Sequence, residues 1–156
     1  MGDGSLKEGL QQLILQLGVD NIVTLVGWKN QQEVIEIIKN SDIMLAPSVT
    51  SRNGDREGIP VVLMETMAMG LPIISTVHSG IPELIENGVS GFLVPERDVD
   101  ALAEKLNYLV ENPDIWRNMG AAGRGFVEEY YNIDKLNDKL VEIYTSSMST
   151  SMRNYS

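Results

Sequence analysis

Apolar residues recur along the chain in two alternating patterns. One is the three-and-four spacing of an amphipathic helix, as in residues 5–18 and 30–40, and the other is a short continuous apolar run, as in residues 42–47 and 72–76. Runs that are apolar on both faces indicate strands covered on both sides. The alternation therefore predicts an α/β domain in which helices flank a Rossmann-like parallel sheet.

The predicted order is helix, strand, helix, strand, helix, strand, helix, strand and then three helices. Strands are expected at residues 21–27, 42–47, 72–76 and 91–95. Helix ends carry capping signals: Ser5 and Asp98 precede helical patterns, Gly18 ends one, and Asn30 and Glu33 form a capping-box arrangement. Ligands of such a sheet usually bind at the carboxyl ends of its strands.

The segment EGIPVVLMETMAMG, residues 57–70, is predicted to be a helix that follows a strand and a polar loop. Its apolar surroundings predict burial on every side, yet Glu57 stands at its start and Glu65 in its middle. Eight helical residues rise by ~12 Å, which suits two acceptors on one extended ligand better than an acid–base pair. The alternatives are a first-turn acid for Glu57 and an edge carboxylate reaching water for Glu65.

The start of this predicted helix is a candidate anion site. Free N–H groups and the helix dipole favour negative charge there, and Gly58 lets a ligand approach the backbone closely. Pro60 has no N–H, so the expected donors are Gly58, Ile59 and Val61. The alternative is that Gly58 and Pro60 only shape the entry to the helix.

Basic and imidazole side chains near this segment are few. Arg52 and Arg56 lie in the preceding loop, where they either pair with phosphate or remain solvated. His78 is the only histidine and follows a predicted strand, so it is either a base or, more simply, a loop histidine. With one histidine and no cysteine, we expect no metal site.

Composition limits the possible partners. The 156 residues suffice for one domain with a sizeable core, and the formal net charge of −10 argues against nucleic acid as a partner. Any phosphate ligand would therefore need a locally positive feature. The lack of cysteine fits a reducing compartment, and no apolar run reaches the ~20 residues of a membrane span. We expect a cytoplasmic protein. If it is part of a longer parent chain, a peripheral position of that parent at the inner membrane is also compatible with the sequence.

These motifs resemble family 4 of the retaining glycosyltransferases. EGIPVVLME is similar to the family signature of two glutamates with seven residues between them. Similar segments surround it in the family's order: GDGSL, VTLVGW, SDIMLAPS, MAMGLPIISTVHSGIPELIENGVSGFLVPERD and MGAAGRGFVEEYY. The likeness covers residues 2–145 and is strongest to bacterial colanic-acid-type transferases of exopolysaccharide and capsule synthesis. It implies the C-terminal, donor-binding half of a GT-B fold.

The resemblance implies a role for each candidate residue. Glu57 would be catalytic and contact the hydroxyl groups of the donor sugar, the amides of Gly58 and Ile59 would hold the diphosphate, and Glu65 would take the ribose hydroxyl groups. Residues 27–29 would lie near the nucleobase. The further donor-binding residues that it implies are Arg56, Ser79, Gly80 and Ile81.

The implied reaction moves a hexosyl group from a UDP- or GDP-sugar to an acceptor with retention of configuration. It implies no metal and no cofactor apart from the donor substrate, because the helix dipole and basic side chains stabilise the leaving diphosphate. Family members carry an Arg and a Lys on an earlier strand and loop, and an N-terminal acceptor domain, none of which is found here.

We therefore expect residues 1–145 to be a donor domain truncated at its N-terminus and inactive alone, followed by a disordered tail over residues 146–156. Two alternatives stay open. One is a stand-alone nucleotide-sugar binding module with a native start at Met1, and the other is a nucleotide-sugar epimerase of similar architecture.

Overall fold

The computed structural model describes residues 2–51, 53–54 and 56–153, with side chains described as far as residue 148. The chain divides into two compact units that meet in sequence between Asn40 and Ser41. No helix in the described ranges is both long enough and apolar enough to cross a membrane.

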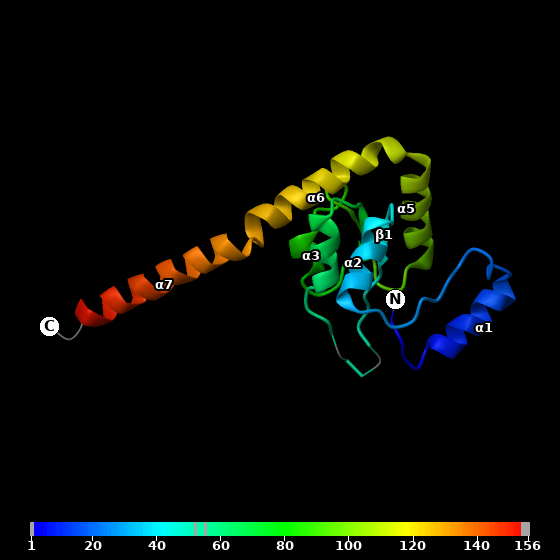
Figure 1. Ribbon diagram of the computed structural model, residues 1–156, viewed down its shortest axis with the longest axis horizontal. Helices are drawn as coiled ribbons and strands as arrows, with labels where there is room; N and C mark the ends of the chain where they lie inside the picture. The colour runs from blue at the N-terminus through cyan, green and yellow to red at the C-terminus, as the bar shows by residue number, and fades with distance from the viewer. Residues whose placement is uncertain (1, 52, 55, 154–156) are drawn as a thin grey trace. The chain divides into compact units, whose positions relative to one another are not determined.

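The first unit contains helices α1 (Lys7–Leu17) and α2 (Gln31–Lys39) (Figure 1). The capping box predicted before α2 is confirmed: Oδ1 of Asn30 accepts the N–H of Glu33 at 3.0 Å, and Oε2 of Glu33 accepts the N–H of Asn30 at 3.0 Å. Both bonds use N–H groups that the first helical turn leaves free.

Helix α1 ends as predicted but begins differently. Gly18 takes a left-handed φ of +65°, which a glycine adopts without steric cost. The residue before the first helical turn is Leu6 rather than Ser5, and no side chain caps it.

Residues 22–26, between α1 and α2, form no strand, so the strand predicted at residues 21–27 is wrong. All five residues are exposed, and Ile22 is 77% exposed. A strand exists only where a neighbouring strand pairs with its backbone N–H and C=O groups. Within the described part of the chain, no strand pairs with this segment.

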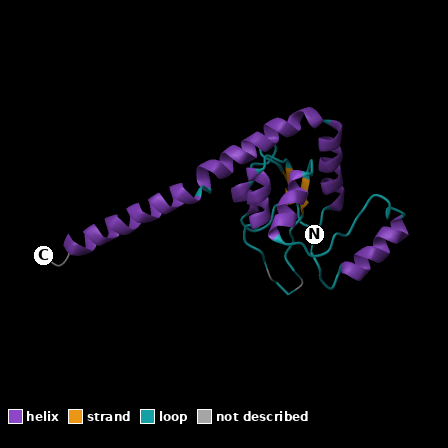
Figure 2. Cartoon of the chain, in the orientation of Figure 1, coloured by secondary structure: helices purple, strands orange, loops and turns teal. Residues whose placement is uncertain are grey.

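The second unit contains all the described strands. Its elements in order are β1 (Met44–Ala46), α3 (Val61–Ala68), β2 (Ile73–Thr76), α4 (Ile81–Leu84), β3 (Phe92–Val94), α5 (Val99–Glu111), the 3₁₀ turn η1 (Pro113–Ile115), α6 (Trp116–Tyr130) and α7 (Ile133–Arg153) (Figure 2). This order matches the alternation read from the sequence. Helix α7 continues to Arg153, through most of the segment for which a disordered tail is predicted, and residues 154–156 lie outside the described ranges.

The three strands form one parallel sheet in the order β1-β2-β3. Met44 pairs with Ile73 across the first ladder, and Ile74 pairs with Phe92 across the second. Helices separate consecutive strands in the chain, which is the connection that parallel strands require. The prediction of a parallel Rossmann-like sheet flanked by helices is confirmed.

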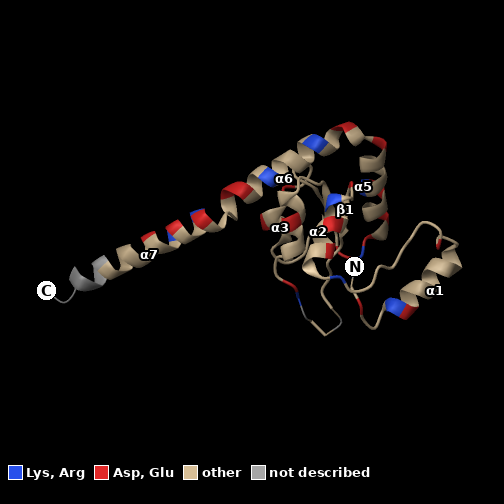
Figure 3. Ribbon diagram, in the orientation of Figure 1, with Lys and Arg blue, Asp and Glu red and all other residues tan. Residues whose placement is uncertain are grey.

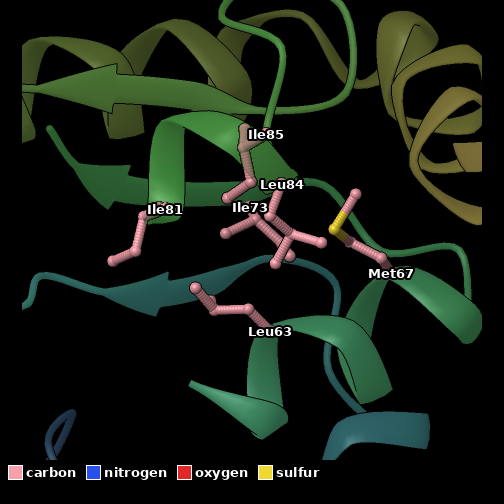
Figure 4. Close-up of a cluster of buried hydrophobic side chains, with 6 residues drawn as sticks. All are labelled: Leu63, Met67, Ile73, Ile81, Leu84 and Ile85. Carbon is pink, nitrogen blue, oxygen red and sulfur yellow. The ribbon is translucent and has the colours of Figure 1, made fainter. Parts of the chain in front are cut away.

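Two apolar clusters cover the two faces of the sheet. Ile73 packs with Leu63 and Met67 of α3 and with α4, whereas the next residue, Ile74, packs with Leu109 of α5 and with α6. Neighbouring strand residues point to opposite faces, so one apolar run serves both clusters. Figure 4 shows the first cluster, which lies between α3, α4 and the sheet.

Helix α6 passes very close to the end of α3. A Cβ atom on Gly120 would lie 1.8 Å from the carbonyl oxygen of Gly70, so only glycine fits there. Gly70 itself has a φ of +77°. This approach fixes where α3 ends relative to α6.

Acidic and basic residues are interspersed along α6 and α7 (Figure 3).

Candidate functional site

The carboxyl ends of the three parallel strands meet at one edge of the sheet. The loops that leave this edge are residues 47–60 after β1, residues 77–80 after β2 and residues 95–98 after β3. Almost all of the candidates named from the sequence in the second unit lie on these loops or at the start of α3. Residues 27–29 belong to the first unit.

Helix α3 begins later than predicted. Pro60 precedes its first residue with φ −64° and ψ 125°, an extended conformation, so Glu57, Gly58 and Ile59 lie in the loop and the helix starts at Val61. The predicted helix from residue 57 is therefore wrong, and so is the ~12 Å helical rise between the two glutamates. Proline fixes φ and tolerates this position because it has no N–H to leave unpaired.

The start of α3 presents a row of free backbone donors. Within the described residues, no hydrogen bond uses the N–H groups of Gly58, Ile59, Val61 or Val62. Gly58 is exposed, and no other atom would lie within 4 Å of a Cβ placed on it. The N-terminal helix dipole adds a partial positive charge in the same place. This arrangement can bind an anion on an otherwise acidic chain.

The two glutamates occupy different environments. Glu57 is exposed in the loop, and Glu65 is half-buried on α3. Neither carboxylate has a hydrogen bond or ion pair with another described residue. The prediction that this helix is buried on all sides is wrong, because Val61 is 62% exposed whereas Leu63 is fully buried. Only one face of α3 meets the core, which leaves Glu65 able to reach water or a ligand.

The loop after β2 touches the segment before α3. A Cβ atom on Gly80 would lie 2.7 Å from Cγ1 of Ile59, so the glycine permits an approach that a larger residue would block. Ser79 is exposed beside it, with an unusual φ of +47°. Residues separated by about twenty positions in the sequence thus form adjoining parts of one surface.

A polar network joins all three loops. Nδ1 of His78 donates to Oε1 of Glu96 at 2.6 Å, and Oε2 of Glu96 accepts the backbone N–H of Thr50 at 2.9 Å. Nη2 of Arg97 donates to the carbonyl oxygen of Thr50 at 2.8 Å. The hydrogen bond from His78 and, next, that from the Thr50 N–H hold the pKa of the Glu96 carboxyl below its ordinary value.

The remaining sequence candidates separate into accessible and inaccessible residues. Arg56 is exposed in the loop after β1, while Arg52 lies outside the described residues. The side chain of Ile81 is fully buried in the core, and its N–H donates to the carbonyl oxygen of His78 at 3.0 Å. Ile81 therefore positions the loop and has no free group for a ligand. No group of three or more His, Asp or Glu in the described ranges is placed to hold a metal ion.

Sequence reasoning missed Thr50 and Glu96. Their signal is weak, because an acid in the VPERD segment and a threonine in a polar loop are ordinary surface residues. Glu96 nevertheless comes two residues after β3, at the edge where ligands of parallel sheets bind. Applying that rule to the last strand as well as the first would have selected it.

Comparison with known proteins identifies the family to which this chain belongs. Residues 1–126 match the family of glycosyl transferases group 1. The chain belongs to the group 1 glycosyltransferases. Among relatives of this family, it is 44% identical over 143 residues to the amylovoran biosynthesis glycosyltransferase AmsK of Erwinia amylovora, and 41% identical over 144 residues to a protein of Escherichia coli K12 named as the colanic acid biosynthesis glycosyltransferase WcaL.

This group 1 glycosyltransferase chain spans about a third of the length of these relatives. Each alignment covers 92% of the chain but 35% of AmsK and 36% of WcaL.

Solved structures share the fold, among them that of a group 1 glycosyltransferase domain. The C-terminal domain of the group 1 glycosyltransferase LpcC from Francisella tularensis superposes with a TM-score of 0.71 at 25% identity, over 82% of this chain and 63% of that one. Anabaena HepE in complex with UDP-glucose superposes with a TM-score of 0.79 at 24% identity, over 93% of this chain and 39% of that one. The second likeness shows the fold alone.

Proposed function

We propose that this chain is the donor-binding domain of a retaining glycosyltransferase of family 4 that moves a hexosyl group from a UDP- or GDP-sugar to an acceptor in polysaccharide or glycoconjugate synthesis. The observation that carries the proposal is the row of free N–H groups at Gly58, Ile59, Val61 and Val62, at the carboxyl edge of the sheet. The names of AmsK and WcaL, and the UDP-glucose bound to HepE, support this class of substrate.

In this proposal the N–H row at α3 binds the diphosphate of the donor. Unpaired amides and the helix dipole attract phosphate without a basic side chain, which offsets the net charge of −10 locally. Arg56, exposed in the adjoining loop, adds a charged hydrogen bond. Ser79 and Gly80 form the facing wall because Gly80 lies against Ile59.

The two glutamates bind opposite ends of the donor. Glu57 lies in the loop before the N–H row and accepts hydrogen bonds from hydroxyl groups of the transferred sugar. Glu65 lies on α3 and accepts hydrogen bonds from the ribose hydroxyl groups. Glu65 is half-buried and has no partner among the described residues, so its carboxylate is free to accept hydrogen bonds from a ligand.

The proposed chemistry retains the configuration at the anomeric carbon. The bond from this carbon to the diphosphate oxygen breaks while the bond to the acceptor oxygen forms on the same face. The departing phosphate oxygen takes the acceptor proton, and the N–H row stabilises the negative charge that develops on the diphosphate. No metal ion or further cofactor takes part.

The acceptor requires a partner domain in this proposal. Since the chain spans about a third of its relatives, we propose that an N-terminal domain of the same parent binds the acceptor, and that the parent works in the cytoplasm, peripherally at the inner membrane. The structure does not favour the epimerase alternative. An epimerase would need an accessible acid or base, whereas the only histidine is buried and hydrogen-bonded to Glu96.

Calorimetric titration of UDP and GDP into the chain, in buffer containing EDTA, tests the proposal. We expect one of them to bind with a Kd of roughly 1 mM or tighter. UMP is the matched control ligand, and it should bind more weakly than UDP because it lacks the second phosphate. If neither diphosphate binds at millimolar concentration, or if UMP binds as well as UDP, the N–H row is not a diphosphate site.

A further inference from the structure

Glu96 connects the three loops of the candidate donor site. It accepts hydrogen bonds from His78 in the loop after β2, at 2.6 Å, and from the Thr50 N–H in the loop after β1, at 2.9 Å. Glu96 itself belongs to the loop after β3. The hydroxyl of Thr50 also approaches Oε1 of Glu96 at 3.4 Å. One carboxylate therefore holds together segments up to 46 residues apart in the sequence.

The backbone around this contact is held in an unusual conformation on both sides. Ser79, which follows His78, has a φ of +47°, and Arg97, which follows Glu96, has a φ of +64°. Residues with a Cβ atom rarely adopt this left-handed region and stay there only where their surroundings compel them. The bond between His78 and Glu96, together with the bond from Arg97 to the Thr50 carbonyl, supplies that constraint.

The histidine is buried too deeply to act as an ordinary surface base. His78 is 2% exposed, and its Nε2 is buried without a hydrogen-bond partner within the described residues. An ionised carboxylate can only accept, so Nδ1 carries the proton in the contact with Glu96. This contact fixes the orientation of the ring, and the N–H of Ile81 bonds to the carbonyl oxygen of His78 at 3.0 Å.

We propose that His78 and Glu96 are positioning residues for the nucleotide-sugar donor, a role that rests on the proposed function. Their hydrogen bond holds Ser79 and Gly80 in place, and Gly80 in turn lies against Ile59, next to the free N–H groups that receive the diphosphate. Neither side chain needs to touch the donor. Without the bond, the wall at Ser79 and Gly80 loses its fixed distance from the N–H row, and the donor binds to a less ordered site.

Two substitutions of His78 separate the hydrogen bond from simple packing. His78→Asn keeps a side-chain N–H near the place of Nδ1, whereas His78→Leu fills space without a donor. We expect His78→Leu to raise the Kd for UDP by about tenfold and His78→Asn to stay within about twofold of the wild type. Glu96→Ala, at a half-exposed position, should raise the Kd for UDP as much as His78→Leu does. It takes the place of His78→Leu in the test if His78→Leu fails to fold.

The controls distinguish the possible failures. Glu128→Ala removes an exposed ion pair with Arg124 on α6 and should leave the Kd unchanged. If His78→Leu and Glu96→Ala bind UDP like the wild type, or if His78→Asn is as weak as His78→Leu, the positioning role is overturned. If GDP rather than UDP binds to the wild-type chain, the same variants are compared with GDP. If the wild-type chain binds neither UDP nor GDP, the proposed function is overturned, and this inference with it.

The single histidine offers a direct spectroscopic readout. Because the chain has one histidine, its ring resonances are assigned without ambiguity. We expect saturation with UDP to shift these resonances, since the donor site adjoins the loop that His78 holds. A purely structural histidine would lower the unfolding temperature on substitution without such a shift, and that result would overturn the proposal.

Discussion

Gly80 lies so close to Ile59 that a Cβ atom on the glycine would come within 2.7 Å of Cγ1 of the isoleucine. This contact joins the loop after β2 to the EGIP segment before α3. It places the two segments that resemble glycosyltransferase motifs on one surface, and it makes the spacing between them sensitive to a single methyl group.

The first prediction concerns this contact. Gly80→Ala should displace Ile59 and raise the Kd for UDP by about tenfold, because the neighbouring N–H groups move with it. Gly80 has a φ of −84°, so alanine itself adds no backbone strain. Adding Ile59→Ala should restore binding by making room for the new methyl group. Calorimetry on the wild type, Gly80→Ala and the double variant measures this, and a double variant that binds UDP as weakly as Gly80→Ala would contradict the steric explanation.

The second prediction concerns the packing of α6 on the end of α3. Gly120→Ala should lower the free energy of unfolding by about 3 kcal/mol, because its Cβ meets the backbone oxygen of Gly70, which cannot rotate away. Gly125→Ala on the same helix is the matched control. It points into open space and should raise stability by up to about 1 kcal/mol. Urea unfolding measures both, and equal effects would refute the close approach.

The third prediction concerns catalysis by the full-length parent. Glu57→Gln should lower kcat/KM by about a hundredfold or more, because it removes a charged acceptor from the hydroxyl groups of the transferred sugar. Circular dichroism should show an unchanged fold, since Glu57 is exposed. The exposed Glu104→Gln on α5 is the control and should keep full activity. An active Glu57→Gln parent would remove the catalytic role of this residue.

The fourth prediction concerns the nucleotide. Glu65→Gln should raise the Kd for UDP by about tenfold, because a charged acceptor of the ribose hydroxyl groups becomes a neutral one. Its unfolding temperature should stay close to that of the wild type, since no described residue pairs with Glu65. If the substitution instead lowers the unfolding temperature and leaves UDP binding unchanged, Glu65 is a structural residue.

The fifth prediction concerns pH. Glu96 has a folded-state pKa below its ordinary value, chiefly because of the His78 hydrogen bond, so its charge stabilises the fold above the unfolded pKa. Glu96→Gln should therefore lower stability at neutral pH. The difference from the wild type should disappear as the pH falls through the unfolded and then the folded pKa of this carboxyl.

Urea unfolding across this pH range, with Glu128→Gln in the exposed pair on α6 as the control, measures that difference. A gap between wild type and Glu96→Gln that stays constant down to acid pH would show that the charge of Glu96 is not its cause.

Much of the fold follows from local pattern. The structure confirms the strands at residues 44–46, 73–76 and 92–94 and the capping box at Asn30 and Glu33. It also confirms that α1 ends at Gly18. Each depends on residues within a few positions, so a sequence carries the necessary signal. The prediction of a strand at residues 21–27 was wrong for the opposite reason, because β structure requires a pairing partner that local pattern does not supply.

The sequence also determined the chemical character of the site: its EGIP segment, its glycines and its glutamates after an apolar strand. Tertiary structure decided where α3 begins, that Glu65 is half-buried, that Ile81 belongs to the core, and that His78, Glu96 and Thr50 meet. These outcomes depend on contacts across as many as 46 residues of sequence. Such contacts form only after the sheet brings distant strand ends to one edge, so no local pattern encodes them.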